Sequence, residues 1–210
     1  MPDLSKRSLE KELLDRDDIP FEDIKQNMEE LDFINTHLGG HQITIKGIKS
    51  FFPQLTGQSM SHLTICEIGC GGGDNLRAIK KWCTQQNIAV SLTGVDLNPH
   101  CIAYAKSRKE NEGIEFIVSD YSSVSFQQKP AIIFSSLFCH HFTEANLKIQ
   151  FQWMKENAML VFIINDLQRH VLAYHSISML TKLFSKSYLV KNDARLSVLR
   201  GFHKKELVNL

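Results

Sequence analysis

From residue 63 onward, short apolar runs alternate along the chain with longer segments in which apolar residues recur every three or four positions. The short runs are typical of buried strands, and the longer segments are typical of helices that cover a sheet. Their alternation favours an α/β domain with a mostly parallel sheet and helices on both faces. We predict strands at residues 63–68, 88–95, 114–118, 131–137 and 159–164.

The segments between these strands carry helix signals of their own. One helix begins at Asp74, directly after a glycine run. Asn98 is placed to cap the next helix, with Pro99 in its first turn, where a missing N–H does no harm. Thr143 is placed to cap a third helix that has apolar residues on one face.

Residues 1–60 have no strand pattern and carry apolar residues at helical spacing instead. We predict a helical N-terminal extension that ends near Gly39 and Gly40, followed by a short helix from about Gln42 to Phe52 and a loop from Pro53 to Ser61. Two interpretations are open. The extension either packs on the sheet as a cover or also closes over a ligand as a lid.

Residues 61–210 are predicted to form one domain with a helical insertion at residues 167–190. The chain has 210 residues, of which 43% are hydrophobic, enough for one large buried core. The insertion carries an apolar stripe at helical spacing, which is usually core packing and is otherwise suited to the wall of an apolar pocket. The stripe consists of Ala173, Ile177, Leu180 and Phe184.

The charge balance disfavours a general nucleic-acid binder. Lys and Arg number 24 against 23 for Asp and Glu, so the chain has no global basic field. The five cysteines include no C-x-x-C pair, which indicates buried reduced thiols. The N-terminus is charged, and no window approaches the length of a membrane span. We therefore expect a cytoplasmic protein that acts on a small molecule and has no membrane partner.

The segment LTICEIGCGGGD, residues 63–74, is the place where the sequence specifies a ligand. Its strand carries Glu67 near the carboxyl end, and glycines follow at alternate positions, Gly69, Gly71 and Gly73. Glycine permits a tight turn and lets a ligand approach the backbone. The helix that follows offers free N–H groups to an anionic group.

A dinucleotide site fits this segment poorly. Its G-x-G-x-x-G spacing, started from Gly69 and Gly71, would place the third glycine at position 74, which is Asp74. Glu67 would also face a pyrophosphate, whereas a cationic amino-acid ligand suits it. A turn that merely connects strand to helix is the remaining alternative, and so many glycines would then be costly in chain entropy.

Over about residues 60–166 the pattern resembles class I S-adenosylmethionine-dependent methyltransferases. The family's glycine motif matches the E-x-G-x-G-x-G segment, its ribose-binding acidic residue matches Asp96, and its position near the adenine matches Asp120. The resemblance implies a Rossmann-like methyltransferase fold with S-adenosylmethionine as cofactor and S-adenosylhomocysteine as product. The implied cofactor-binding residues are Glu67, Gly69, Cys70, Gly71, Gly73, Asp96, Leu97, Asp120 and Tyr121.

These assignments have structural alternatives. A carboxylate at Asp96 is a strong acceptor for two adjacent hydroxyls, but the residue could also cap a helix or a turn. Asp120 lies in an S-D-Y sequence that also makes an ordinary loop. Glu67 is the candidate anchor for the methionine end of the cofactor, through the backbone that it positions or through a water.

A narrower resemblance, carried by residues 135–142 and 165–177, is to a bacterial small-molecule branch of the family. It implies methyl transfer to a phenolic, quinone-like or polyketide-like acceptor. The Asn/Asp-Pro-Pro-aromatic motif of amino-methylating DNA enzymes does not follow the fourth strand, so no DNA partner is expected. Family members also end in an antiparallel pair of strands, and the chain stops at Leu210 without residues for them.

Methyl transfer depends mainly on holding nucleophile and methyl in line, which contributes up to about 7 to 11 kcal/mol. A general base adds about 10²- to 10⁴-fold. The catalytic candidates are His140 and His141, after the fourth strand, and Asp166, after the fifth; His170 is a weaker one. One of the two adjacent histidines is expected to have a structural role.

Asp166 and Arg169 either bind a polar group of the acceptor or form a salt bridge that steadies the loop. No metal site is predicted, because no further ligands accompany the two histidines at helical or hairpin spacing. Two other functions stay open: a non-catalytic partner subunit that binds the cofactor, and an RNA methyltransferase that uses the basic cluster of Arg195, Arg200, Lys204 and Lys205. The oligomeric state is left open.

Overall fold

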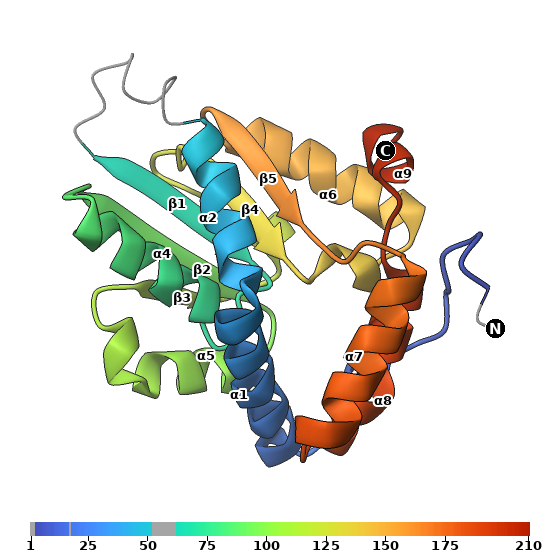
Figure 1. Cartoon of the computed structure of the whole chain (residues 1–210). Coiled ribbons are helices and arrows are strands. Elements are labelled where there is room, and N and C mark those ends of the chain that lie inside the picture. The colour runs from blue at the N-terminus through green and yellow to red at the C-terminus, as the bar shows by residue number, and fades with distance from the viewer. Residues whose placement is uncertain (1–2, 17, 52–61) are drawn as a thin grey trace. The chain divides into compact units, whose positions relative to one another are not determined.

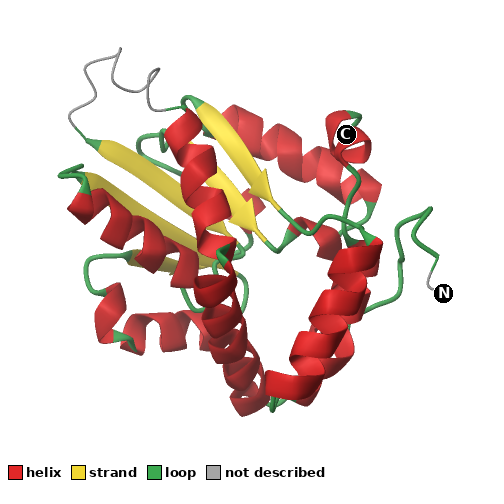
Figure 2. Ribbon diagram, viewed as in Figure 1, coloured by secondary structure: helices red, strands yellow, loops and turns green. Residues whose placement is uncertain are grey.

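The computed structural model describes residues 3–16, 18–51 and 62–210. The predicted loop from Pro53 to Ser61, and Phe52 at the end of the helix before it, lie outside the described residues. Figure 1 shows the elements along the chain and Figure 2 separates helices from strands.

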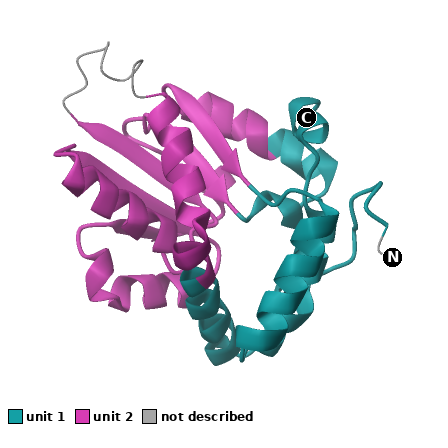
Figure 3. Ribbon diagram, in the orientation of Figure 1, with its two compact units in different colours: residues 1–33, 137–149, 166–210 teal, residues 34–136, 150–165 magenta. Residues whose placement is uncertain are grey.

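The chain divides into two compact units, coloured separately in Figure 3. Unit 1 consists of residues 1–33, 137–149 and 166–210, and unit 2 consists of residues 34–136 and 150–165. Both units draw on more than one stretch of the sequence. The predicted division between a helical extension at residues 1–60 and a domain at residues 61–210 does not coincide with the boundaries of these units, and it stays a prediction.

Unit 2 contains a five-stranded sheet in the order β3-β2-β1-β4-β5, and every neighbouring pair of strands is parallel. The strands lie within two residues of their predicted ranges, and the described residues add no strand after β5. They are β1 (Leu63–Ile68), β2 (Val90–Asp96), β3 (Glu115–Val118), β4 (Ile132–Ser136) and β5 (Val161–Asn165).

The strand order places a topological switch between β1 and β4. The chain steps outward from β1 to β3 and then returns to the other side of β1 with β4. In open α/β sheets, ligands bind outside the carboxyl ends of the strands at such a switch. The glycine segment follows β1 directly and therefore lies at this position of the sheet.

The helices of unit 2 pack on this sheet as the apolar pattern predicts. Asn98 caps its helix, since its side-chain oxygen accepts hydrogen bonds from the backbone N–H groups of His100 and Cys101 at 2.9 and 3.4 Å. The helices are α2 (Gly40–Ser50), α4 (Asp74–Gln85) and α5 (Pro99–Ser107), with short 3-10 turns η2 (Lys109–Asn111) and η3 (Tyr121–Ser123). Helix α6 (Glu144–Asn157) has residues in both units.

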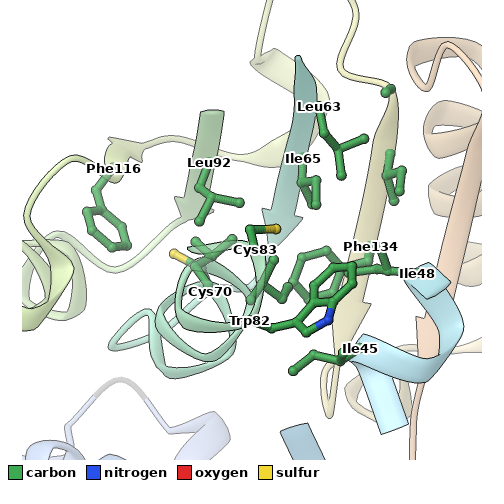
Figure 4. Packing of buried hydrophobic residues seen from close by; sticks show 14 of the residues in the cluster. Ile45, Ile48, Leu63, Ile65, Cys70, Trp82, Cys83, Leu92, Phe116 and Phe134 are labelled. Carbon is green, nitrogen blue, oxygen red and sulfur yellow. The ribbon is translucent and has the colours of Figure 1, made fainter. Parts of the chain in front are cut away.

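The core of unit 2 lies between the sheet and these helices (Figure 4). Ile65 of β1 and Phe134 of β4 are buried there. Ile45 and Ile48 of α2 and Trp82 of α4 belong to the same cluster. The second helix of the N-terminal extension is thus a structural part of the sheet unit, and the roles of the extension as a cover or as a lid both stay predictions.

Unit 1 is helical. Its N-terminal segment contacts the helix at Tyr188–Arg200, where Ser8 N donates to Leu199 O at 3.0 Å and the backbone N–H groups of Leu13 and Leu14 donate to Asp193. Its elements are η1 (Leu13–Asp15), η4 (Cys139–His141), α7 (Val171–Phe184), α8 (Tyr188–Arg200) and α9 (Lys204–Val208), and α1 (Phe21–Leu38) begins in it. Among the described residues, no helix combines the length and the apolar character needed to cross a membrane.

Candidate functional site

The glycine turn after β1 has the backbone geometry that the sequence indicates. Gly69, Gly71 and Gly73 all have positive φ, at 69°, 49° and 74°. Gly69 N donates to Val95 O at 2.8 Å, which ties the turn to the end of β2. A Cβ at Gly73 would lie 2.6 Å from the ring of Phe116. The turn before α4 is therefore restricted to glycine by conformation and, at Gly73, by space.

Asp96 fixes this turn to the end of β2. Its Oδ2 accepts a hydrogen bond from Gly71 N at 2.8 Å, and its Oδ1 accepts one from Asn98 N at 2.9 Å. Burial raises the pKa of Asp96 although these backbone donors lower it. Each carboxylate oxygen retains acceptor capacity beyond its one backbone bond. The predicted contact of Asp96 with ribose hydroxyls is compatible with this geometry and stays a prediction.

Glu67 is the unusual group of the site. Its side chain is 1% exposed, and its Oε1 accepts a hydrogen bond from Asn75 Nδ2 at 3.1 Å. Its Oε2 is buried without a hydrogen-bond partner among the described residues. Burial, and then the negative charge of Asp74, raise the pKa of Glu67 well above its ordinary value. A buried acceptor without a donor is costly, so this oxygen is available to a ligand that donates.

Helix α2 of the N-terminal extension is connected to the Glu67 carboxyl group through one residue, Asn75. His41 of α2 places its Nδ1 2.9 Å from Asn75 Oδ1, and its Nε2 lies 3.7 Å from Asp74 Oδ2. Asn75 thus contacts Glu67 with its amide nitrogen and His41 with its amide oxygen. Sequence reasoning did not find His41, because nothing in the spacing links α2 to the first turn of α4.

The remaining cofactor candidates have mixed surroundings. Asp120 Oδ1 accepts from Ser122 N at 2.8 Å and from Ser122 Oγ at 2.6 Å, so Asp120 has the loop-forming role that was its alternative. Leu97, next to Asp96, is 70% exposed. Cys70 is buried, and burial raises the pKa of its thiol. Tyr121 packs edge to face on Trp153, with ring centroids 5.3 Å apart. Their predicted contacts with the cofactor remain predictions.

The catalytic candidates come together in unit 1. His140 Nδ1 lies 2.7 Å from Asp166 Oδ1, and His140 N donates to Asp166 Oδ2 at 3.1 Å. Burial alone would raise the pKa of Asp166, but His140 and the backbone donors lower it below its ordinary value. His170 instead caps α7, where its Nδ1 accepts from Leu172 N at 3.2 Å. The structure therefore groups His140 with Asp166 and gives His170 a structural task.

His141 has a separate carboxylate partner. Its Nδ1 lies 2.6 Å from Asp15 Oδ1, and Arg200 Nη1 donates to Asp15 Oδ2 at 2.8 Å. These contacts and a backbone donor outweigh burial and lower the pKa of Asp15 to about 2. The sequence offered no signal for this cluster, because Asp15 and Arg200 lie far from His141 along the chain.

Arg169 does not pair with Asp166. It is 1% exposed, and it donates to Leu4 O at 2.9 Å, to Gly201 O at 2.6 Å and to Glu206 Oε1 at 2.6 Å. These contacts fix the chain termini of unit 1 to the segment after β5. Of the two alternatives for Arg169, the structural salt bridge is the one present, with Glu206 as its partner.

Comparison with known proteins confirms the methyltransferase resemblance at the level of a domain. A family model described as "Methyltransferase domain" matches residues 65–157. This segment includes the glycine turn, Asp96 and Asp120, and it also includes His140 and His141. A search of curated proteins finds no match.

Solved structures confirm the Rossmann-like methyltransferase fold. The plantazolicin methyltransferase BpumL, in complex with a triazolic desmethylPZN analog and S-adenosylhomocysteine (SAH), matches 90% of this chain and 69% of its own with a TM-score of 0.65 and 20% identity. BpumL with SAH matches 70% and 53%, at a TM-score of 0.54 and 23% identity. The plantazolicin methyltransferase BamL matches 89% and 63%, at 0.56 and 18%. The chain thus spans between about half and two thirds of these proteins.

Proposed function

We propose that this protein binds S-adenosylmethionine at the glycine turn of unit 2 and transfers its methyl group to a small-molecule acceptor. The methyltransferase family match and the fold support this proposal. The observation that carries it is the buried Oε2 of Glu67, which lacks a donor beside a turn of the required shape. The ammonium group of the cofactor's methionine end is a donor of suitable charge.

Three groups of unit 2 would hold the cofactor. Glu67 would accept a charge-assisted hydrogen bond from the ammonium group, and its alignment depends on Asn75. Asp96 would accept hydrogen bonds from the ribose hydroxyls while its backbone contacts keep it in place. The free N–H groups at the start of α4 would face the cofactor's carboxylate.

The bound cofactor supplies a methyl group on a sulfonium, which is a strong electrophile. In the transfer, the acceptor oxygen would gain the methyl group as the sulfur–carbon bond broke, S-adenosylhomocysteine would be the leaving group, and the acceptor proton would pass to a base or to water. Placement of the two reacting groups lowers the barrier by about 7 to 11 kcal/mol. A general base increases the rate by about 10²- to 10⁴-fold, which corresponds to only about 3 to 5 kcal/mol. The proposal therefore does not require His140, His141 or Asp166 to accept the proton.

For the acceptor we propose a phenolic, quinone-like or polyketide-like hydroxyl compound. The near-neutral net charge of +1 disfavours a polyanionic substrate. Helix α7 presents exposed apolar side chains that suit the wall of an apolar site, namely Leu172, Met179, Leu183 and Phe184. Phe184 belongs to the stripe for which core packing was one interpretation, and at 75% exposure it is not core. The triazolic desmethylPZN analog in the BpumL complex makes azole-containing compounds a second acceptor class to test.

The basic cluster does not favour an RNA substrate. Arg200 is 5% exposed, and its guanidinium donates to the backbone oxygens of Glu10, His140 and His141. It is therefore committed to the interior of unit 1 and is not available for a phosphate.

The test is a mass-spectrometric screen in which the protein is incubated with S-adenosylmethionine and candidate phenols, quinones, polyketide fragments and azole-containing compounds. The proposal expects one acceptor to gain the mass of a methylene group, with stoichiometric formation of S-adenosylhomocysteine. Asp96→Ala serves as the inactive control. If the cofactor binds but no acceptor class gains mass, the non-catalytic partner subunit becomes the better description.

A further inference from the structure

A second set of convergent polar groups belongs to unit 1, whereas the groups assigned to the cofactor belong to unit 2. It consists of Glu12, His140 and His141, whose potential ligand atoms all lie within 4.8 Å of one another. His140 Nε2 is 3.6 Å from Glu12 Oε1, and His141 Nε2 is 3.9 Å from Glu12 Oε2. Both imidazoles therefore direct the same ring nitrogen toward one carboxylate.

The opposite nitrogen of each ring is held by a different carboxylate. Asp166 lies 2.7 Å from Nδ1 of His140, and Asp15 lies 2.6 Å from Nδ1 of His141. A carboxylate at Nδ1 favours the tautomer that carries its proton there and leaves the lone pair of Nε2 free. This pairing is the usual surrounding of a histidine that ligates a metal.

The gaps at Nε2 are too long for hydrogen bonds and suit an intervening ion. An N–H···O bond spans about 2.7 to 3.2 Å, and both distances to Glu12 exceed this range. In a tetrahedral zinc site with ligand distances of about 2.1 Å, neighbouring ligand atoms are about 3.4 Å apart. The observed 3.6 and 3.9 Å are close to that separation.

The burial and the charges of this cluster also favour a bound cation. Glu12 and His140 are each 3% exposed. Three carboxylates surround the histidines, and the guanidinium of Arg200 pairs with two of them, Glu12 and Asp15. Arg7 adds a second positive charge near Asp166. With both histidines neutral and the three carboxylates ionised, one negative charge remains in excess, and buried negative charge needs a compensating cation.

We propose that Glu12, His140 and His141 form a binding site for a divalent transition-metal ion, with Zn²⁺ as the ion that best fits two imidazoles and a carboxylate. Asp166 and Asp15 orient the two imidazoles. The ion links the N-terminal segment beside η1 to η4 and so stabilises unit 1. Adjacent histidines suggested no metal from the sequence because the third ligand lies more than 120 residues away. A metal-bound imidazole has no free lone pair, so this role excludes the role of a base.

The test is a titration of the full chain, stripped of metal by a chelator, with Zn²⁺. We expect one equivalent to bind and the unfolding temperature to rise with Zn²⁺ concentration, since an ion that binds only the folded state stabilises it. Co²⁺ in place of Zn²⁺ should give visible d–d bands without a sulfur-to-metal charge-transfer band. A strong charge-transfer band would overturn the ligand assignment, because it would point to a cysteine.

Variants identify the ligands. Glu12→Gln and His141→Gln should each weaken Zn²⁺ binding at least tenfold, and Asp166→Asn should weaken it about 10- to 100-fold. The exposed His175 provides the matched control, and His175→Gln should bind as the unaltered protein does. If Glu12→Gln does not fold, His141→Gln tests the ligand assignment instead, because the side chain of His141 is 20% exposed.

Two results would overturn the proposal. One is a folded chain that binds no Zn²⁺, in which case the cluster is a network of protonated histidines between carboxylates. The other is unchanged affinity in His141→Gln. Binding of S-adenosylhomocysteine, measured on the same samples, is independent of both results, so failure of the metal site and failure of the proposed methyl transfer are distinguishable.

Discussion

The exchange Glu67→Gln tests how the buried carboxyl group of unit 2 takes part in cofactor binding. Burial and the negative charge of Asp74 raise the pKa of Glu67 well above its ordinary value, so its protonated form persists to higher pH than that of an ordinary carboxyl group. An ammonium group favours the ionised form, so binding of the cofactor should release a proton. Below the raised pKa, cofactor affinity should therefore increase with pH by up to about tenfold for each pH unit.

The magnitude follows from the contact that Oε2 lacks in the free protein. A hydrogen bond to a charged group contributes about 1.5 to 3 kcal/mol, so Glu67→Gln should weaken binding about 10- to 150-fold. The variant should also lose the proton release and the pH dependence of affinity. An exposed glutamate of the same unit offers the control, Glu112→Gln, which should change neither.

The stability of the free protein should shift in the opposite direction. A raised pKa means that the neutral form of Glu67 is favoured in the folded state, so its contribution is present below pH 4.5 and is lost as pH rises through the raised pKa. Glu67→Gln does not lose this contribution, because glutamine does not ionise. Its free energy of unfolding should therefore improve relative to the unaltered protein as pH increases, as followed by urea unfolding at several pH values.

The assay is isothermal titration with S-adenosylhomocysteine in two buffers that have the same pH and different ionisation enthalpies. The difference in apparent binding enthalpy gives the number of protons released. Equal affinity and equal proton release for the unaltered protein and Glu67→Gln would refute the reasoning and leave Glu67 as a buried residue without a role in the site.

Three further outcomes follow from local geometry. Gly73 and Gly113 both have positive φ, so an alanine at either position should cost roughly 1 to 3 kcal/mol of conformational free energy. Only at Gly73 would the added Cβ also meet Phe116, so Gly73→Ala should destabilise the fold more than Gly113→Ala in urea unfolding. Asp15→Asn should lower stability above pH 3.8, and the deficit should vanish in acid unfolding as pH falls through about 2. Asp96→Ala should weaken the binding of S-adenosylmethionine and of S-adenosylhomocysteine by the same factor, as measured by calorimetry, because both compounds contain the ribose.

The sheet of unit 2 could be predicted from the sequence because strand and helix periods are local signals. All strands, the cap at Asn98 and the glycine turn after β1 depend on residues within a few positions of one another. The polar residues at the carboxyl ends of the strands were found for the same reason, since a parallel sheet brings these ends to one edge.

The partners of those residues could not be predicted, because they come from distant segments. His41 reaches Asn75 from α2, and Glu12 and Asp15 reach His140 and His141 from the N-terminal segment. No period or motif links such pairs in a single sequence.

Backbone strain is a further feature that the pattern does not reveal. Leu137, directly after β4, has a φ of 52°, a conformation that a leucine rarely adopts. The segment at residues 131–137, which is apolar and β-branched at its start, predicts a strand up to this residue, but the strand ends at Ser136. Such outliers concentrate at functional sites, and this one precedes the histidine pair.

The most direct test of the central claim is a crystal structure of the chain with S-adenosylhomocysteine. We expect the ligand at the glycine turn of unit 2, with its ammonium nitrogen within hydrogen-bond distance of Glu67 Oε2 and its ribose hydroxyls on Asp96. A ligand bound elsewhere, or one at the turn whose ammonium group leaves Glu67 Oε2 without a donor, would contradict the account.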